Sequence, residues 1–439
     1  MPAKRFLFTT IGGESGQLIP IFAVASRLVS RGHHVRMLLG PSPTGADSRG
    51  IVDRAEAAGC ETSVIQLSRA DAVKVPAMRH LIFGWTPERI GMPVAMLHRV
   101  YAFTPQFAAQ FAAELARSPV DAVAADSFYP GAMIAAEAAG VPAVSLMHNP
   151  YHSVRPRLVP RGAGHRPAGG PADRIRHAVQ LAIHRRLASR NALPGLNAAR
   201  VRMGLAPVHS LAEHEDGLVR VLVLSSPTFD FHPQPLPPNV RIVGWPVKAA
   251  PSDGELWKPT KTDAGQPLVL LSPSTTTQAQ EQLPFFNRAL EGISELEVQG
   301  LLTVGPSAQT DAFAAPPNVS VEPYVPHSAV MPRASLIVSH CGHGTVMTAL
   351  SYGVPVLCVP YGRDQYDVAA RVVWAGAGLE ISKDATTAEI RQAIRTMTDA
   401  PDFKKSAQKL AAAMAAEDGA ETAANELEVV AQTGASRRS

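Results

Sequence analysis

The chain has little of what would mark several classes of protein. Only three of its 439 residues are cysteines, Cys60, Cys341 and Cys358, too few and too scattered for a disulfide framework or a zinc site. Its net charge is only +4 and its 41 basic residues are spread along the chain, which argues against nucleic acid as the main partner. No apolar run is long enough to span a membrane.

The N-terminus also lacks a long apolar signal segment, because Met1 to Arg5 lead directly into a short strand-like run. We therefore expect a cytoplasmic protein with reduced cysteines and no transmembrane segment, while contact with a membrane surface stays open. What the chain does have is 46% hydrophobic residues over 439 positions. That is enough to fill the cores of two or more domains.

Strand and helix patterns alternate in both halves of the chain. In the first half, the apolar run 6–10 is followed by a Gly-rich turn, a helix-spaced apolar face over 18–29, and a second strand over 35–39. The second half begins a similar series at 268–272. This order predicts an α/β protein built from two Rossmann-like parallel-sheet domains.

The most informative stretch runs from 335 to 367. A buried strand over 335–339 leads into the turn His340-Cys-Gly-His-Gly-Thr345, which is followed by a helix over 346–352 and a further strand over 354–359. In such a βαβ unit the turn lies at the carboxyl edge of the sheet, where ligands bind.

The residues of this turn suit a diphosphate. Free N–H groups at Gly344 and Thr345 and the positive helix end would attract its charge, and His340 could donate to a phosphate oxygen. Asp364 and Gln365 follow the next strand and return to the same edge, where their side chains would suit sugar hydroxyls.

The ordered set H-C-G-x-G-T, G-V-P and D-Q resembles the nucleotide-sugar signature of the family 1 glycosyltransferases, which have the GT-B fold and decorate natural products and antibiotics. The resemblance covers nearly the whole chain and is strongest over 320–370. Tyr324-Val325-Pro326-His327 resembles the aromatic-x-Pro-Gln element of that family. This implies that Tyr324 stacks on the nucleobase beside Val325, and that His327 takes the ribose-side position.

The resemblance extends to other donor positions. Gly342 belongs to the glycine-rich turn, while His343 occupies a position that varies in the family. Thr275 falls where the family has a phosphate-contacting hydroxyl, although a plain Ser/Thr-rich helix start explains it as well. Thr348 replaces a glutamate with which many UDP-sugar enzymes hold the ribose, which favours a dTDP-sugar and leaves UDP-sugars open.

The catalytic positions depart from the family pattern. The family's G-H-x-x-P turn carries the general base, whereas here Gln17 takes the place of the histidine, and a glutamine cannot accept a proton at neutral pH. Asp126 matches the aspartate that orients that histidine, with an N-cap for the helix after Pro130 as the alternative. We expect Asp126 as the base, Glu14 as the second choice, and Ser15 with Gln17 as positioning groups.

Four regions follow from these patterns. An acceptor-binding domain is expected over 1–232, a Pro-rich linker without regular structure over 233–266, a nucleotide-sugar domain over 267–418, and a helix and tail over 419–439 that cross back to the first domain. We expect a mobile loop over 152–173, and a break at Pro401 in the helical C-terminal part. Aromatic and methionine residues over 83–103 are explained by helix packing or by an apolar acceptor wall.

The resulting hypothesis is an inverting hexosyltransferase. It would move a sugar from a dTDP- or UDP-sugar to a hydroxyl of an apolar small molecule, without a cofactor or a metal, as a monomer or homodimer. Two alternatives remain. Gln17 also fits a catalytically weak homologue that assists a partner glycosyltransferase, and a nucleotide-sugar epimerase would use the same fold.

Overall fold

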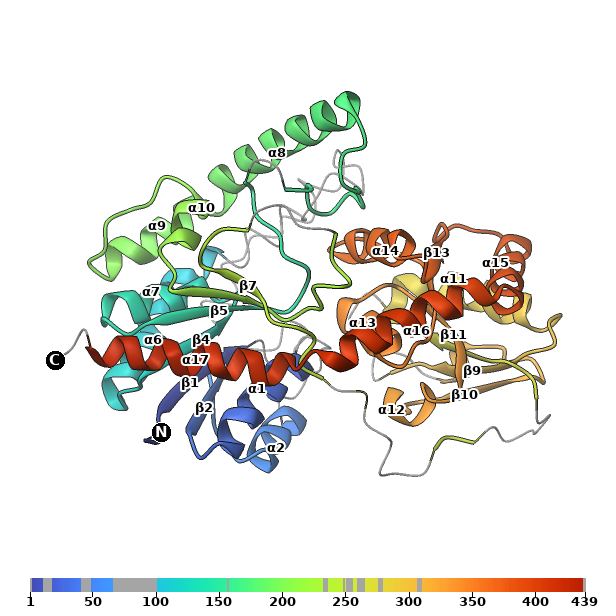
Figure 1. The fold of residues 1–439 in the computed structure, drawn as a ribbon, viewed down its shortest axis with the longest axis horizontal. Coiled ribbons are helices and arrows are strands. Elements are labelled where there is room, and N and C mark those ends of the chain that lie inside the picture. Colours follow the sequence, from blue (N-terminus) through green and yellow to red (C-terminus); the bar gives the residue numbers. More distant parts are fainter. Residues whose placement is uncertain are drawn as a thin grey trace.

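Two parallel β-sheets form the framework of the protein (Figure 1). The structure is a computed structural model, and it describes residues 2–10, 18–40, 49–65, 101–155, 158–231, 236–247, 249, 256–258, 265–274, 279–305 and 310–436. Its two sheets have seven and six strands, and helices cover them. The predicted α/β architecture with two parallel-sheet units is confirmed.

The first sheet has the order β3-β2-β1-β4-β5-β6-β7, and all its pairings are parallel. Its strands are β1 (Arg5–Thr10), β2 (His34–Leu39), β3 (Glu61–Val64), β4 (Ala122–Asp126), β5 (Ala143–Met147), β6 (Arg220–Val223) and β7 (Val240–Ile242). The strand order reverses between β1 and β4, and the ends of these two strands form the crevice in which α/β sheets bind ligands.

Strand β7 corrects one expectation. The Pro-rich stretch 233–266 was expected to form no regular element, but β7 lies within it and pairs with β6. Three residues free of proline, Val240 to Ile242, are enough for an edge strand, because an edge strand needs hydrogen bonds on one side only.

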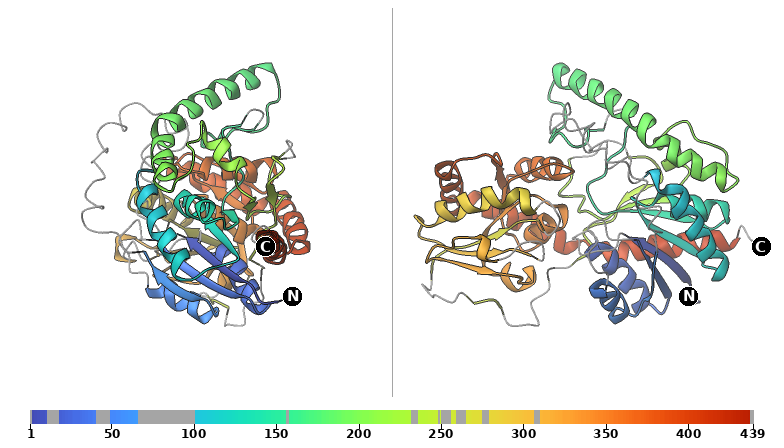
Figure 2. Two further views of the ribbon diagram at one scale, coloured as in Figure 1. Left: turned by 90° about the vertical axis from the view of Figure 1, so that its left-hand side faces the viewer. Right: turned by 180° about the vertical axis from the view of Figure 1, so that it is seen from behind.

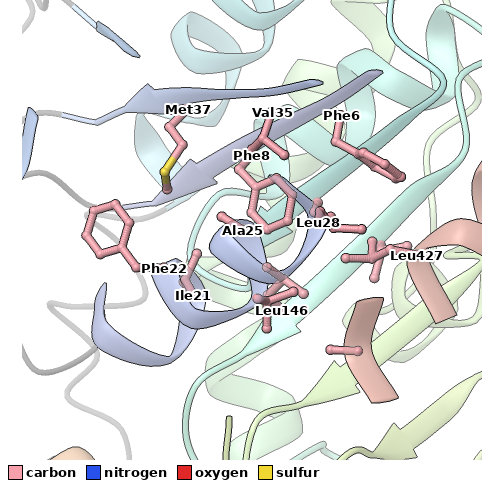
Figure 3. Close-up of a cluster of buried hydrophobic side chains, with 14 of the residues drawn as sticks. Phe6, Phe8, Ile21, Phe22, Ala25, Leu28, Val35, Met37, Leu146 and Leu427 are labelled. Carbon is pink, nitrogen blue, oxygen red and sulfur yellow. The ribbon is translucent and has the colours of Figure 1, made fainter. Parts of the chain in front are cut away.

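Helices pack on both faces of the first sheet. They are α1 (Leu18–Ser30), α2 (Arg49–Ala57), α6 (Thr104–Arg117), α7 (Pro130–Ala138), α8 (Pro171–Asn191), α9 (Leu193–Arg202) and α10 (Leu211–Asp216). Helix α1 buries the predicted apolar face, with Ile21 and Leu28 fully inaccessible. Figure 3 shows these side chains meeting Phe8 of β1 and Leu427 near the C-terminus in one cluster.

The second sheet has the order β10-β9-β8-β11-β12-β13 and is also parallel. Its strands are β8 (Leu268–Ser272), β9 (Gln299–Thr303), β10 (Val319–Glu322), β11 (Ala334–Ser339), β12 (Val356–Cys358) and β13 (Gly378–Glu380). Its helices are α11 (Ala279–Ile293), α12 (His327–Val330), α13 (His343–Ser351), α14 (Gln365–Trp374), α15 (Thr387–Asp399) and α16 (Pro401–Ala416). The predicted break at Pro401 is confirmed, because α15 ends at Asp399 and α16 begins at the proline.

The last helix, α17 (Gly419–Ser436), lies against α1 of the first domain (Figures 1 and 2). Leu427 joins the core of that domain, and Glu428 pairs with Arg31 at 2.9 Å and with His33 at 2.8 Å. The chain crosses between the domains at Gly244 and Gly419, where a side chain on Gly419 would approach the Gly244 carbonyl oxygen to 2.4 Å. None of the helices in the described part of the chain is long and apolar enough to cross a membrane.

Candidate functional site

Asp126 lies at the end of β4 and is completely buried. Its Oδ1 accepts a hydrogen bond from the backbone N–H of Phe128 at 2.9 Å, and its Oδ2 accepts one from the Thr10 hydroxyl at 3.3 Å. The N-cap position of α7 is Tyr129, so Asp126 does not cap that helix. The carboxylate is thus fixed at the point where the strand order reverses, between the ends of β1 and β4.

His148 and Asn149 follow the neighbouring strand β5. The Nδ1 atom of His148 lies 3.4 Å from Oδ2 of Asp126. Both residues are buried, with 4% and 2% exposed. Both ring nitrogens of His148 and the Oδ1 of Asn149 lack a hydrogen-bond partner within the described residues. Only one feature of the sequence indicates that these two residues belong to the site, namely their position directly after a buried strand.

A cavity of about 160 Å³ opens at the same edge of the first sheet. Most of its walls are apolar. Its lining residues are Tyr101, Ser127, Phe128, Pro130, Met133, Ser145, Met147, His152, Ser153, Val154, Arg161, His184, Leu187, Ala188, Leu211, His214, Glu215, Leu218 and Val221. Burial lowers the pKa of His214 to about 4, so this imidazole is neutral at pH 7. The cavity therefore presents a mostly apolar space whose polar groups include a neutral imidazole and the side chains of Arg161 and Glu215.

The turn after β11, where the donor site was predicted, contains a backbone conformation that is rare for a residue with a side chain. Cys341 has a φ of +65°, a left-handed conformation that is uncommon for a residue with a side chain. Gly342 is the N-cap of α13, and a side chain there would meet the His340 Nε2 atom at 2.7 Å. The turn therefore brings the His340 ring against the start of the helix. The helix itself begins at His343, three residues earlier than expected.

His340 and His327 are both held in the neutral form. Burial lowers the pKa of His340 to about 4, opposed by the Ser272 backbone carbonyl and the Asp364 carboxylate. Burial alone lowers the pKa of His327 to about 4. His327 Nε2 lies 3.3 Å from the hydroxyl of Ser272, so the last residue of the element Tyr324 to His327 lies beside the end of β8.

Further predicted donor residues are distributed around this turn. Gly344 and Thr345 lie in the first turn of α13, and Thr348 donates its hydroxyl hydrogen to the Gly344 carbonyl at 2.8 Å. The Oε1 of Gln365 accepts from the backbone N–H of Tyr361 at 2.7 Å.

Asp364 and Tyr324 differ in exposure. Asp364 is half-buried at the N-cap of α14. Tyr324 leaves 67% of its surface exposed, and Val325 beside it packs against the core. An aromatic face open to solvent is what a stacking platform for a base requires.

Direct hydrogen bonds join the two domains beside this site. His343 donates and accepts across the boundary, with Nδ1 2.8 Å from the His148 carbonyl oxygen and Nε2 3.1 Å from the Ser225 hydroxyl. Burial lowers the pKa of His343 to about 4, so one nitrogen carries a proton and the other accepts. His343 therefore packs at the domain boundary, with both ring nitrogens paired.

A second contact involves the loop expected over 152–173. Its described residues up to Gly170 form no helix or strand, as expected, but Asp367 of α14 holds the loop. The carboxylate of Asp367 accepts from the backbone N–H groups of Gly162 at 2.7 Å and Gly164 at 3.2 Å. A smaller cavity lies here, lined by Asn149, Pro150, Tyr151, His152, Val159, Pro160, Arg161, Asp364, Asp367 and Arg371.

Four predicted site residues, Glu14, Ser15, Gln17 and Thr275, lie outside the described residues, as do most of the aromatic and methionine residues over 83–103. Within the described residues, no group of three or more His, Cys, Asp or Glu side chains could hold a metal ion. The site thus consists of two facing parts, the corner of Asp126 and His148 with its cavity, and the turn after β11 with Asp364.

The comparisons with known proteins agree on what this chain is similar to. Residues 287–430 match the family model described as erythromycin biosynthesis protein CIII-like, C-terminal domain. The 4'-demethylrebeccamycin synthase of Lentzea aerocolonigenes is 28% identical over 433 residues, which cover 94% of this chain and 96% of that protein.

Solved structures show the same fold. The calicheamicin glycosyltransferase CalG4 superposes with a TM-score of 0.72 at 19% identity, covering 99% of both chains. The glycosyltransferase VinC in complex with DTDP gives 0.65 at 22% identity, covering 98% of this chain and 100% of that one. The predicted fold and enzyme class are confirmed: this chain has the GT-B fold and is a glycosyltransferase, and part of its second domain is similar to the erythromycin biosynthesis protein CIII-like C-terminal domain.

Proposed function

We propose that the protein transfers a sugar from a nucleoside diphosphate to a hydroxyl of an apolar small molecule. The observation that carries this proposal is the adjacency of two cavities at the domain boundary. His152 and Arg161 line both the larger apolar cavity and the smaller one that contains Asp364. An apolar acceptor in the first would lie next to the sugar-binding side chain of the second.

The donor occupies the turn after β11 in this proposal. The free N–H groups at the start of α13 and the neutral ring of His340 hold the diphosphate, Tyr324 stacks on the base beside Val325 and His327, and Asp364 with Gln365 binds the sugar. Gly342 supports this arrangement, because any side chain there would displace His340. Thr275, as a further phosphate contact, completes the expected set.

Thymidine diphosphate is the proposed nucleotide. The Thr348 hydroxyl hydrogen is already donated to Gly344, so this side chain cannot replace a carboxylate that holds both ribose hydroxyls. A deoxyribose does not need that pair. The VinC structure, a protein of the same fold, contains bound DTDP, and this supports the choice of nucleotide.

We propose that the transfer inverts the anomeric centre. The acceptor corner belongs to the first domain and the donor turn to the second, and in this proposal the acceptor oxygen attacks the anomeric carbon from the side opposite to the diphosphate. A single displacement inverts that centre. The helix terminus of α13 and the side chains around it would stabilise the leaving diphosphate, so the proposal requires no metal.

Calorimetric titration of the purified protein with dTDP and with UDP, each in the presence of EDTA, tests the donor part. We expect binding of both nucleotides, with dTDP tighter. Binding that depends on added Mg²⁺ would refute the metal-independent reading. Failure of both nucleotides to bind would refute the donor site and leave the auxiliary-partner hypothesis, for which a pull-down of a second glycosyltransferase is the next experiment.

A further inference from the structure

The acceptor hydroxyl must lose a proton during transfer, and the residues at the acceptor corner differ in their capacity to take it. Gln17 carries an amide, which is not basic at neutral pH. Asp126 is completely buried and uses both carboxylate oxygens, one for the Phe128 N–H and one for the Thr10 hydroxyl. Because both of its oxygens already accept hydrogen bonds, the Asp126 carboxylate is better suited to orienting a neighbouring side chain than to accepting the proton itself.

His148 is that neighbour. Its Nδ1 lies 3.4 Å from the Asp126 Oδ2, and neither ring nitrogen has a hydrogen-bond partner within the described residues. A buried polar atom without a partner costs free energy, so its persistence calls for an explanation such as a ligand or catalytic role. The adjacent Asn149 Oδ1 is also without a partner in the described chain, which places two such residues at one point.

The position of His148 relative to the two cavities supports a catalytic role. The residue before it, Met147, lines the larger cavity, and the residue after it, Asn149, lines the smaller cavity together with Asp364. Its ring contacts Phe128, another wall of the larger cavity, with 5.2 Å between the ring centroids. His148 therefore lies at the junction of the proposed acceptor and sugar positions.

We propose that His148 is the general base of the transfer and that Asp126 is its positioning residue. This assignment rests on the proposed function and replaces the sequence-based expectation that Asp126 itself is the base. In the proposed arrangement the Nδ1–H group of His148 faces the Asp126 carboxylate, and the lone pair of Nε2 is free to receive a proton.

The step balances without any further reactant. The acceptor oxygen forms a bond to the anomeric carbon as the bond between that carbon and the diphosphate oxygen breaks. The electron pair of the broken bond leaves with the diphosphate, and the acceptor proton moves to Nε2 of His148. The resulting imidazolium faces the Asp126 carboxylate, which stabilises its charge.

The test compares acceptors of different acidity. Wild-type protein and His148→Gln are assayed with a dTDP-sugar and a series of phenols that ends with 4-nitrophenol, which ionises without a base. We expect kcat of the variant to fall about 10²- to 10⁴-fold on the weakly acidic phenols, to approach the wild-type value on 4-nitrophenol, and KM for the donor to stay unchanged. Asp126→Asn is expected to show the same dependence on acidity with a smaller loss.

The pH profile supplies a second readout. The groups of the described chain that face His148 are Asp126 from β4, His343 from α13 and His152 from the loop after β5. Burial lowers the pKa of both His343 and His152, which favours the neutral form of each. We expect the acid limb of kcat in the wild-type protein to disappear in His148→Gln.

A matched control separates catalysis from the loss of a buried histidine. His33 is also buried, at 7% exposed, and binds Glu428 far along the chain; His33→Gln should lower the melting temperature and leave kcat unchanged. Equal loss on all phenols in His148→Gln, or no loss at all, would overturn the assignment. Wild-type protein that binds dTDP but transfers to no acceptor would instead refute the proposed function, and the assignment with it.

Discussion

Replacing His343 by leucine should loosen the contact between the two domains by an amount that the structure allows us to estimate. The change removes two hydrogen bonds, to the His148 carbonyl at 2.8 Å and to the Ser225 hydroxyl at 3.1 Å. It leaves the buried carbonyl unpaired, whereas the serine hydroxyl can rotate. With about 1 kcal/mol for the bond to Ser225 and about 1–3 kcal/mol for leaving the His148 carbonyl unpaired, we expect a loss of about 2–4 kcal/mol.

Urea unfolding followed by tryptophan fluorescence measures this loss, because the Trp245 ring lies 5.6 Å from the His343 ring and reports on the boundary. Ser225→Ala is the matched partial change and should cost about 1 kcal/mol. The double variant should cost less than the sum of the two, since both changes remove the same bond. His343→Leu within about 0.5 kcal/mol of the wild type, or Ser225→Ala as costly as His343→Leu, would refute the reasoning.

Three further predictions concern the donor side and pH. His340→Ala should abolish dTDP binding in calorimetry while the melting temperature stays near that of the wild type; retained binding would contradict the donor assignment. Tyr324→Ala should weaken nucleotide binding roughly 2- to 10-fold, since aromatic stacking is worth about 0.5–1.5 kcal/mol. Tyr324→Phe should bind normally, and a loss in both variants would argue against stacking. Burial lowers the pKa of His214 and His327 to about 4 from an unfolded value of 6.5, so the unfolded state binds more protons in that window. Stability should therefore be full above about pH 6.5 and fall towards pH 4 by up to about 1.4 kcal/mol per pH unit for each histidine; equal urea midpoints at pH 5 and 7.5 would contradict this.

The helices and strands of the fold could be predicted from local sequence patterns. Apolar spacing predicted the buried face of α1, including Ile21 and Leu28, and the short apolar runs predicted buried strands such as β11. Those signals repeat within a few residues, because helices and strands have fixed periods. Strand β7 escaped prediction because three residues among prolines have no detectable period.

The candidate site likewise has one part that a local sequence pattern predicts and another that depends on contacts between distant residues. The turn after β11 could be predicted from the sequence, since its glycines and histidines lie within six residues and each has a local reason to be there. The pairing of Asp126 with His148, and of His343 with both His148 and Ser225, joins residues that are far apart in the chain. Which neighbour a buried polar side chain meets depends on how the strands are ordered and how the domains face each other, and neither leaves a pattern in the sequence.

The return of α17 to the first domain has a consequence for the order in which a nascent chain can fold. The core of the first sheet includes Leu427 and its neighbours on α17, which are packed beside α1. A ribosome makes these residues only after the whole second domain. The first domain must therefore wait with an uncovered apolar face until α17 has been made, which exposes it to aggregation and to chaperones in the meantime. A fragment that stops before Gly419 would keep that face uncovered permanently.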